Sequence, residues 1–110
     1  MLSIKKGEIR PLAMNVLRKS TAPIIFVGSP QYQIREYPYI AGFNVIVPAF
    51  PTLWDTAEIT DNQVYAQIDT SDSWAITGMQ YRIYFKVFVK ATEASDTDTI
   101  KGYIPFSITD

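Results

Sequence analysis

The stretch "TGMQYRIYFKVFVKA", residues 77–91, alternates apolar and polar side chains along most of its length. The apolar positions are Met79, Tyr81, Ile83, Phe85, Val87 and Val89, and the residues between them are Gln80, Arg82, Tyr84, Lys86, Phe88 and Lys90. Successive side chains of a β-strand point to opposite faces of the sheet. The two-residue period therefore predicts a half-buried strand with an apolar inner face and an outer face of cations and rings. Its length of about eleven residues predicts a central place in the sheet.

Several other segments show the same alternation. Their apolar positions are Leu12, Met14 and Val16; the run at residues 24–27; Tyr32 and Ile34; Val64, Ala66 and Ile68; and Ile104, Phe106 and Ile108. The turn formers Gly28-Ser29-Pro30 and Asp61-Asn62 separate them, and the polar residues 18–21 and 92–99 predict exposed loops. Because Pro105 cannot donate a backbone hydrogen bond, it predicts that the last strand lies at a sheet edge or contains a bulge.

Residues 37–54 fit this pattern less well. They are rich in apolar side chains but are interrupted by Pro38, Pro48 and Pro51. We expect a strand at residues 43–47 inside an extended loop, which either completes the domain's own core or forms an interaction surface. Residues 52–58 contain a weak helix-start signal, which predicts two helical turns at most.

Many short strands, regular turn signals and the lack of a helical period predict an all-β protein. The architecture expected from the residues is an antiparallel sandwich or barrel, and we favour the sandwich. A chain of 110 residues with 47% hydrophobic residues is long enough for one core, so residues 1–110 are expected to form a single domain.

The composition removes several kinds of chemistry. The chain contains no cysteine and no histidine, which excludes disulfides, thiolate nucleophiles and cysteine-based metal sites. No signal peptide and no apolar run of the roughly 18 residues that a membrane helix needs is visible, so we expect neither ordinary secretion nor a membrane partner. A net charge of −1 gives no broad positive field for nucleic acid.

No catalytic constellation is visible, so we do not expect an enzyme or a cofactor. The serines lie in no nucleophile elbow, and a carboxylate pair such as Asp55 with Glu58 would need a sizeable cleft. Asp69, Ser71 and Asp72 together, or Asp96 and Asp98, could supply oxygen ligands for calcium, but neither group has the spacing of a calcium loop. Turn-forming side chains explain both groups more simply, and no metal site is predicted.

Two groups of residues are candidates for an interaction surface. The first is the outward row Arg82, Tyr84, Lys86 and Phe88, and the second is Tyr39, Phe50 and Trp54 in the proline-interrupted segment. A row of cations and rings can stack on bases or sugars, but an ordinary solvated face, or a face covered by a protein partner, is the preferred interpretation. Whether Trp54 and Trp74 belong to the core or to a contact surface stays open.

The order of the segments resembles a known family. The stretches "IKKGEIRPLAMNVL" (4–17), "YQIRE" (32–36), "AEITDNQVYAQIDTSD" (57–72), "TGMQYRIYFKVFV" (77–89) and "GYIPFSIT" (102–109) carry the resemblance. Together they look like the N-terminal immunoglobulin-like domain of upper baseplate proteins from tailed phages that infect Gram-positive bacteria, and like similar small prophage proteins.

This resemblance implies an immunoglobulin-like β-sandwich that is a non-catalytic structural part of a virion. Such a protein is made in the host cytoplasm and is held in a tail or baseplate by protein–protein contacts, with other tail subunits or with copies of itself. An alternative is a carbohydrate-binding or adhesion module, in which Tyr84, Phe88, Trp54 or Trp74 would serve as stacking platforms.

Overall fold

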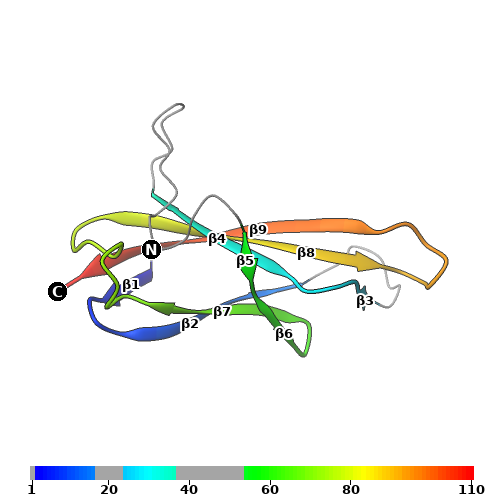
Figure 1. Ribbon diagram of the computed structural model, residues 1–110, viewed down its shortest axis with the longest axis horizontal. Helices are drawn as coiled ribbons and strands as arrows, with labels where there is room; N and C mark the ends of the chain where they lie inside the picture. The colour runs from blue at the N-terminus through cyan, green and yellow to red at the C-terminus, as the bar shows by residue number, and fades with distance from the viewer. Residues whose placement is uncertain (1, 17–23, 37–53) are drawn as a thin grey trace.

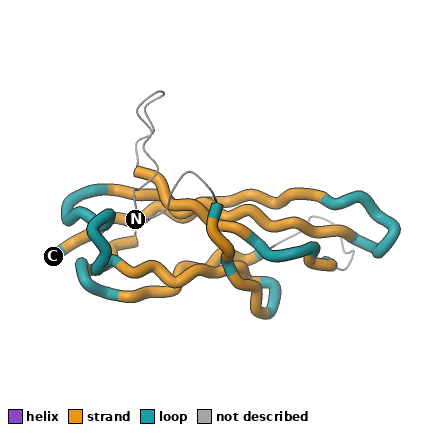
Figure 2. The backbone as a smooth tube through the Cα atoms, in the orientation of Figure 1, coloured by secondary structure: helices purple, strands orange, loops and turns teal. Residues whose placement is uncertain are grey.

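The computed structural model describes residues 2–16, 24–36 and 54–110, and these residues form strands, turns and loops without a helix (Figures 1 and 2). The strands are β1 (Leu2–Lys5), β2 (Ile9–Asn15), β3 (Ile25–Phe26), β4 (Gln31–Glu36), β5 (Asp55–Thr56), β6 (Glu58–Thr60), β7 (Gln63–Asp69), β8 (Gln80–Lys90) and β9 (Asp98–Thr109). A large sheet has the order β1-β9-β8-β4-β5, with β3 also paired to β8, and a small sheet has the order β2-β7-β6. Figure 1 shows the large sheet as the upper layer and the small sheet as the lower layer, so the all-β two-layer prediction is confirmed.

Strand β8 is the centre of the large sheet. Its register with β9 runs from Gln80↔Ser107 to Val89↔Asp98, and its register with β4 runs from Lys86↔Gln31 to Tyr81↔Glu36. Both pairings are antiparallel, whereas β1 adds to the far side of β9 in parallel. The central position expected from the length of this strand is therefore confirmed.

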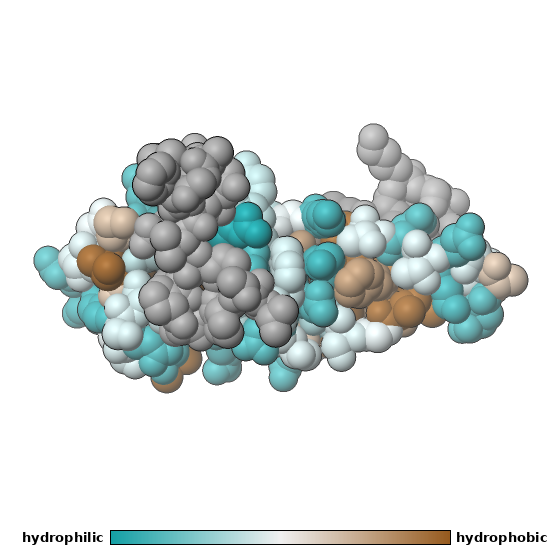
Figure 3. Space-filling model, turned by 45° about the horizontal axis from the view of Figure 1, so that its top comes forward, coloured by the Kyte–Doolittle hydropathy of each residue, from teal (hydrophilic) through white to brown (hydrophobic). Residues whose placement is uncertain are grey.

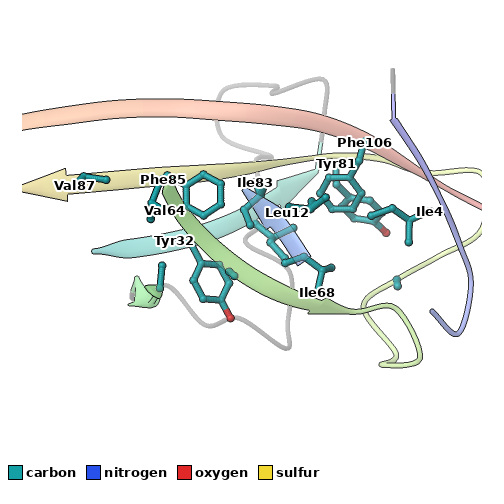
Figure 4. Packing of buried hydrophobic residues seen from close by; sticks show 14 of the residues in the cluster. Ile4, Leu12, Tyr32, Val64, Ile68, Tyr81, Ile83, Phe85, Val87 and Phe106 are labelled. Atoms are coloured by element: carbon teal, nitrogen blue, oxygen red, sulfur yellow. The ribbon is translucent and has the colours of Figure 1, made fainter. Parts of the chain in front are cut away.

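The core forms between the two sheets from the alternate residues of their strands. Tyr81, Ile83, Phe85, Val87 and Val89 of β8 are all at most 1% exposed. From the small sheet, Val64, Ala66 and Ile68 of β7 and Leu12 of β2 belong to the same core cluster. Figure 4 shows Leu12, Val64 and Ile68 between the layers, on the side of Ile83 and Phe85. Burying one such aliphatic or aromatic side chain contributes about 1.5–3 kcal/mol, so this interface is the main source of stability.

The corner between β7 and β8 is closed by an aromatic cluster. Trp74 lies in the connecting loop, is only 2% exposed and contacts Tyr81 edge-on, with the ring centroids 5.3 Å apart. Its ring also meets Phe106 edge-on at 6.4 Å. The Tyr81 hydroxyl donates to the Trp74 carbonyl at 2.8 Å and accepts from the Ile76 amide at 3.1 Å. Trp74 is therefore a core residue, which removes it from the proposed stacking platforms.

Two predicted turns have the expected backbone conformations. Asp61 and Asn62 have φ of 49° and 63°, and they join Thr60 and Gln63, which face each other in β6 and β7. Two left-handed residues between paired strand ends make a hairpin turn of type I′. Gly28, with φ of 65°, lies in the break between β3 and β4, where the register against β8 shifts by two residues.

Three predictions need correction or lie outside the description. The helix start at residues 52–58 is wrong, because Asp55 and Thr56 pair with β4 and residues 58–60 pair with β7. The edge prediction from Pro105 holds for the first part of β9, but β1 covers β9 from Phe106 onward. The strand predicted at residues 43–47, the loop at 18–21, and Tyr39 and Phe50 lie outside the described residues.

Candidate interaction surface

The outer face of the large sheet gathers positive charge. The register places six cations at outward positions of its strands: Lys5, Arg35, Arg82, Lys86, Lys90 and Lys101. Among the outward positions of this sheet within the described ranges, none is Asp or Glu. We call this surface, with the rings of Trp54, Tyr84 and Tyr103, the cationic face. Figure 3, in which the upper layer is turned toward the viewer, shows polar and apolar residues side by side on the surface that it presents.

The rings of the cationic face hold its cations in place. The guanidinium of Arg82 lies 4.2 Å from the centroid of the Tyr103 ring, and that of Arg35 lies 5.5 Å from the Tyr84 ring. Tyr84 and Tyr103 are themselves 5.8 Å apart. A guanidinium stacked on a ring loses conformational freedom. These contacts therefore order the cations and rings of the face.

Trp54 joins this face from outside the strands. It immediately precedes β5, and the ammonium of Lys86 lies 4.4 Å from the centroid of its ring. The same ammonium lies 6.0 Å from the ring of Phe88, its neighbour on the outward side of β8. Both rings and the lysine are half-buried, so Trp54 is a surface-layer residue and not part of the core between the sheets.

A second cation is anchored by a hydrogen bond. The Nε of Arg35 donates to the side-chain carbonyl of Gln33 at 2.8 Å, although both residues lie on the outer side of β4. Gln33 is only 1% exposed, which makes it a buried polar residue on a face that is otherwise half-buried or exposed. At the far end of β8, Lys90 forms an ion pair with Glu93 at 3.4 Å.

A shallow pocket of about 340 Å³ lies in the middle of the cationic face. Its lining combines rings and cations from three strands and the segment before β5: Arg35, Trp54, Tyr84, Phe85, Lys101, Gly102 and Tyr103. The pocket is open to solvent, and none of its described lining residues is a carboxylate. Its rings and cations can accept an anionic or planar group.

The structure brings together most of the residues predicted for binding. Arg82, Tyr84, Lys86 and Phe88 lie on one face with Trp54, as their outward parity suggested. Sequence reasoning missed Lys101 and Tyr103 as members of this face, although both have the polar parity of the last strand. It also could not show that Arg35 lies beside Tyr84, because that contact depends on the pairing of β4 with β8.

A second pocket of about 370 Å³ lies between the sheets on the side of β5 and β6. It is lined by Tyr32, Thr56, Ala57, Glu58, Tyr65, Ala66 and Gln67. Burial, with the nearby Asp55 carboxylate 3.5 Å from the phenol, raises the pKa of Tyr32 to about 12. The phenol therefore stays protonated near neutral pH and cannot serve as a base there.

Asp69, one of the acidic residues considered for calcium, is engaged in a turn. Ser71 donates both its amide and its hydroxyl to Oδ1 of Asp69, and these bonds, helped by Lys6, lower the pKa of that carboxyl. Over the described ranges, no group of three or more His, Cys, Asp or Glu side chains is placed to hold a metal ion. The same part of the chain contains no helix that is long and apolar enough to cross a membrane.

Comparison of the chain with protein-family models, with curated proteins and with solved structures found no match.

Proposed function

We propose that this chain is a non-catalytic structural and assembly module of a phage or prophage tail, of the baseplate type. The observation that carries the proposal is the cationic face, an array of ring-supported cations on the outer side of the large sheet. In the virion this face would contact other tail or baseplate subunits. The proposal requires no cofactor.

The strand order supports an immunoglobulin-like form of the sandwich. That fold places strands B, E and D in one sheet and C, F and G in the other. The small sheet β2-β7-β6 matches B-E-D, and β4, β8 and β9 match C, F and G. One difference is that β1 pairs with β9, whereas the first strand of the constant-type domain lies beside B.

The corner hydrogen bond of Tyr81 gives independent support for this assignment. Immunoglobulin-like domains carry a tyrosine near the start of strand F whose hydroxyl bonds to backbone a few residues upstream, across the E–F corner. Tyr81 is the second residue of β8, and its hydroxyl bonds to the carbonyl of Trp74 in the loop after β7. Tyr81 matches this feature in its position near the start of the strand, in the upstream direction of its hydrogen bond and in its backbone partner.

The chemistry of the cationic face favours a protein partner over a stacking ligand. Trp54, Tyr84 and Tyr103 each have a cation of the same chain near the ring, at 4.2 to 5.5 Å. A sugar or base that stacked on these rings would have to displace those cations. Carboxylates of a protein surface could instead bind the cations where they lie, which keeps the cation–ring contacts intact.

Purified particles test the proposed function. Mass spectrometry of banded particles from the phage or induced prophage that encodes this chain should find it with the tail proteins. Complementation of a deletion should succeed with the wild-type chain and fail with Arg82→Glu/Lys86→Glu. The matched control is Gln63→Glu/Gln67→Glu, which adds negative charge to exposed positions of the small sheet. Absence of the chain from particles, or normal assembly with the reversed cationic face, would contradict the proposal.

The pocket on the cationic face favours one alternative, a carbohydrate-binding or adhesion module. It collects Trp54, Tyr84 and Tyr103 around a space of about 340 Å³, which is large enough for part of a sugar ring system. Selective binding on a glycan array that is lost in Trp54→Ala, with Trp54→Phe retaining it, would favour this alternative.

A further inference from the structure

The charges of this chain are separated in both sequence and space. Residues 37–81 contain no lysine or arginine, although they carry five aspartates and glutamates. Two of these acids, Glu58 and Asp61, are exposed on β6 and in the turn that follows β6. We call these two residues the acidic edge. A chain with a net charge of only −1 thus has one strongly cationic surface and a separate acidic one.

The two surfaces point in different directions. The cationic face lies on the outer side of the large sheet, which is the upper side of the upper layer in Figure 1. The turn after β6 lies at the lower side of the same view, beyond the small sheet. A single copy therefore cannot bring its acidic edge onto its own cationic face.

We propose that the cationic face of one copy binds the acidic edge of a second copy, in a head-to-tail contact. This proposal rests on the proposed assembly function and names the partner of that surface. Charge complementarity supports it, because Lys86 and Lys101 would meet carboxylates of the opposite sign. A contact between two cationic faces is disfavoured, since it would bring charges of the same sign together.

The head-to-tail geometry determines what such an assembly can become. Each copy that uses its cationic face still has a free acidic edge, so the contact is heterologous and continues from copy to copy. Such a series closes into a ring or continues as a filament. Because the participating charges are at the surface, screening by salt weakens the contact.

Sedimentation velocity with complementary neutral variants tests this contact. One variant, Lys86→Gln/Lys101→Gln, neutralises the face, and the other, Glu58→Gln/Asp61→Asn, neutralises the edge; asparagine tolerates the left-handed conformation of residue 61. Wild-type chain at low salt should form oligomers, and either variant alone should associate about tenfold more weakly. An equimolar mixture should give heterodimers that grow no further, because it retains one native face and one native edge.

Several outcomes would overturn the head-to-tail contact. They are a wild-type chain that stays monomeric at low salt, variants that each assemble like the wild type, and a mixture that stays monomeric while the wild type assembles. Tight binding of the monomeric wild type to poly-glutamate or heparin would show a foreign acidic protein or a polyanion as the occupant instead.

Circular dichroism and urea unfolding of each variant check that the fold is retained. Detection of the chain in particles is a separate readout, so the assembly function and the self-contact can fail independently.

Discussion

The hydroxyl of Tyr81 donates a hydrogen bond to the backbone carbonyl of Trp74 at 2.8 Å, across the corner where the chain passes from the small sheet to the large sheet. The same oxygen accepts from the amide of Ile76 at 3.1 Å, so one side chain serves two backbone groups of an irregular loop. This bond fixes the loop above the core and buries the indole of Trp74 against Tyr81 and Phe106.

Replacing this hydroxyl should cost stability without altering the fold. Tyr81→Phe keeps the ring in place but removes a donor and an acceptor from a buried position, and we expect a loss of about 1–2 kcal/mol in the free energy of unfolding. Urea denaturation measures this change. Tyr103→Phe, at a residue that is 51% exposed, is the matched control and should change stability by less than about 0.5 kcal/mol. Equal effects in the two variants would contradict the role assigned to the corner.

The turn between β6 and β7 should accept glycine and reject branched residues. Asn62 has φ of 63°, a conformation that glycine adopts without steric cost. Asn62→Gly should therefore leave stability unchanged or raise it by a few tenths of a kcal/mol, whereas Asn62→Val should lower it by about 1–2 kcal/mol. Thermal unfolding compares the stability of both variants with that of the wild type. A valine variant as stable as the wild type would rule out the type I′ turn.

The two sheets approach each other closely at Gly102. This residue faces Phe85 across the β8–β9 pair, and a Cβ added there would collide with the Sδ of Met14 from β2. Gly102→Ala should cost about 1–3 kcal/mol through overpacking. In a Met14→Ala background the same change should cost much less, because the space is then empty. A double-mutant cycle with no coupling between the two positions would argue against this contact.

Alkaline pH should reveal the burial of Tyr32. Because its pKa is raised to about 12 in the folded chain, the folded state holds a proton that the unfolded state loses near the ordinary value of 10. Stability should therefore fall as pH rises from about 10 to about 12, and less steeply in Tyr32→Phe. The change in tyrosine absorbance during a pH titration should include a late component that is lost in Tyr32→Phe. A Tyr32→Phe variant with the same late step would contradict the assignment.

The alternating strands could be predicted from sequence because burial on one face imposes a period of two. Tyr81, Ile83 and Phe85 are buried in the positions that this period requires, and Val64 and Ile68 meet them from the other sheet. The turn at Asp61-Asn62 was also predictable, because few residue types tolerate two left-handed conformations in succession.

The prediction that was wrong and the features that were missed all depend on contacts between residues far apart in the sequence. The short strand β5 exists because Thr56 and Asp55 pair with Gln31 and Tyr32 of β4, which no local pattern announces. The weak helix signal at this place was overridden by that pairing. Trp74 lies in a loop, where side-chain parity gives no information about burial, so its place in the core became visible only through its contacts with Tyr81 and Phe106.

The candidate surface was predictable in part for the same reason. The outward parity of Arg82 and Lys86 followed from β8 alone, but the charge of the whole face needed the register of β4 and β9. An overall charge of −1 conceals this arrangement, because the acids lie elsewhere in the fold. The net charge therefore gave no sign of the cationic surface, which exists only because the strands pair in this register.

Zero-length cross-linking of a mixture of unlabelled and ¹⁵N-labelled chain tests the proposed docking surface most directly. A carbodiimide joins a lysine to a carboxylate only where the two are in contact, and the isotope label separates links between copies from links within one copy. We expect mixed-isotope links from Lys86 and Lys101 to Glu58 and Asp61, which disappear at high salt. Mixed-isotope links confined to other lysines and carboxylates, under conditions where the chain is associated, would contradict the head-to-tail contact.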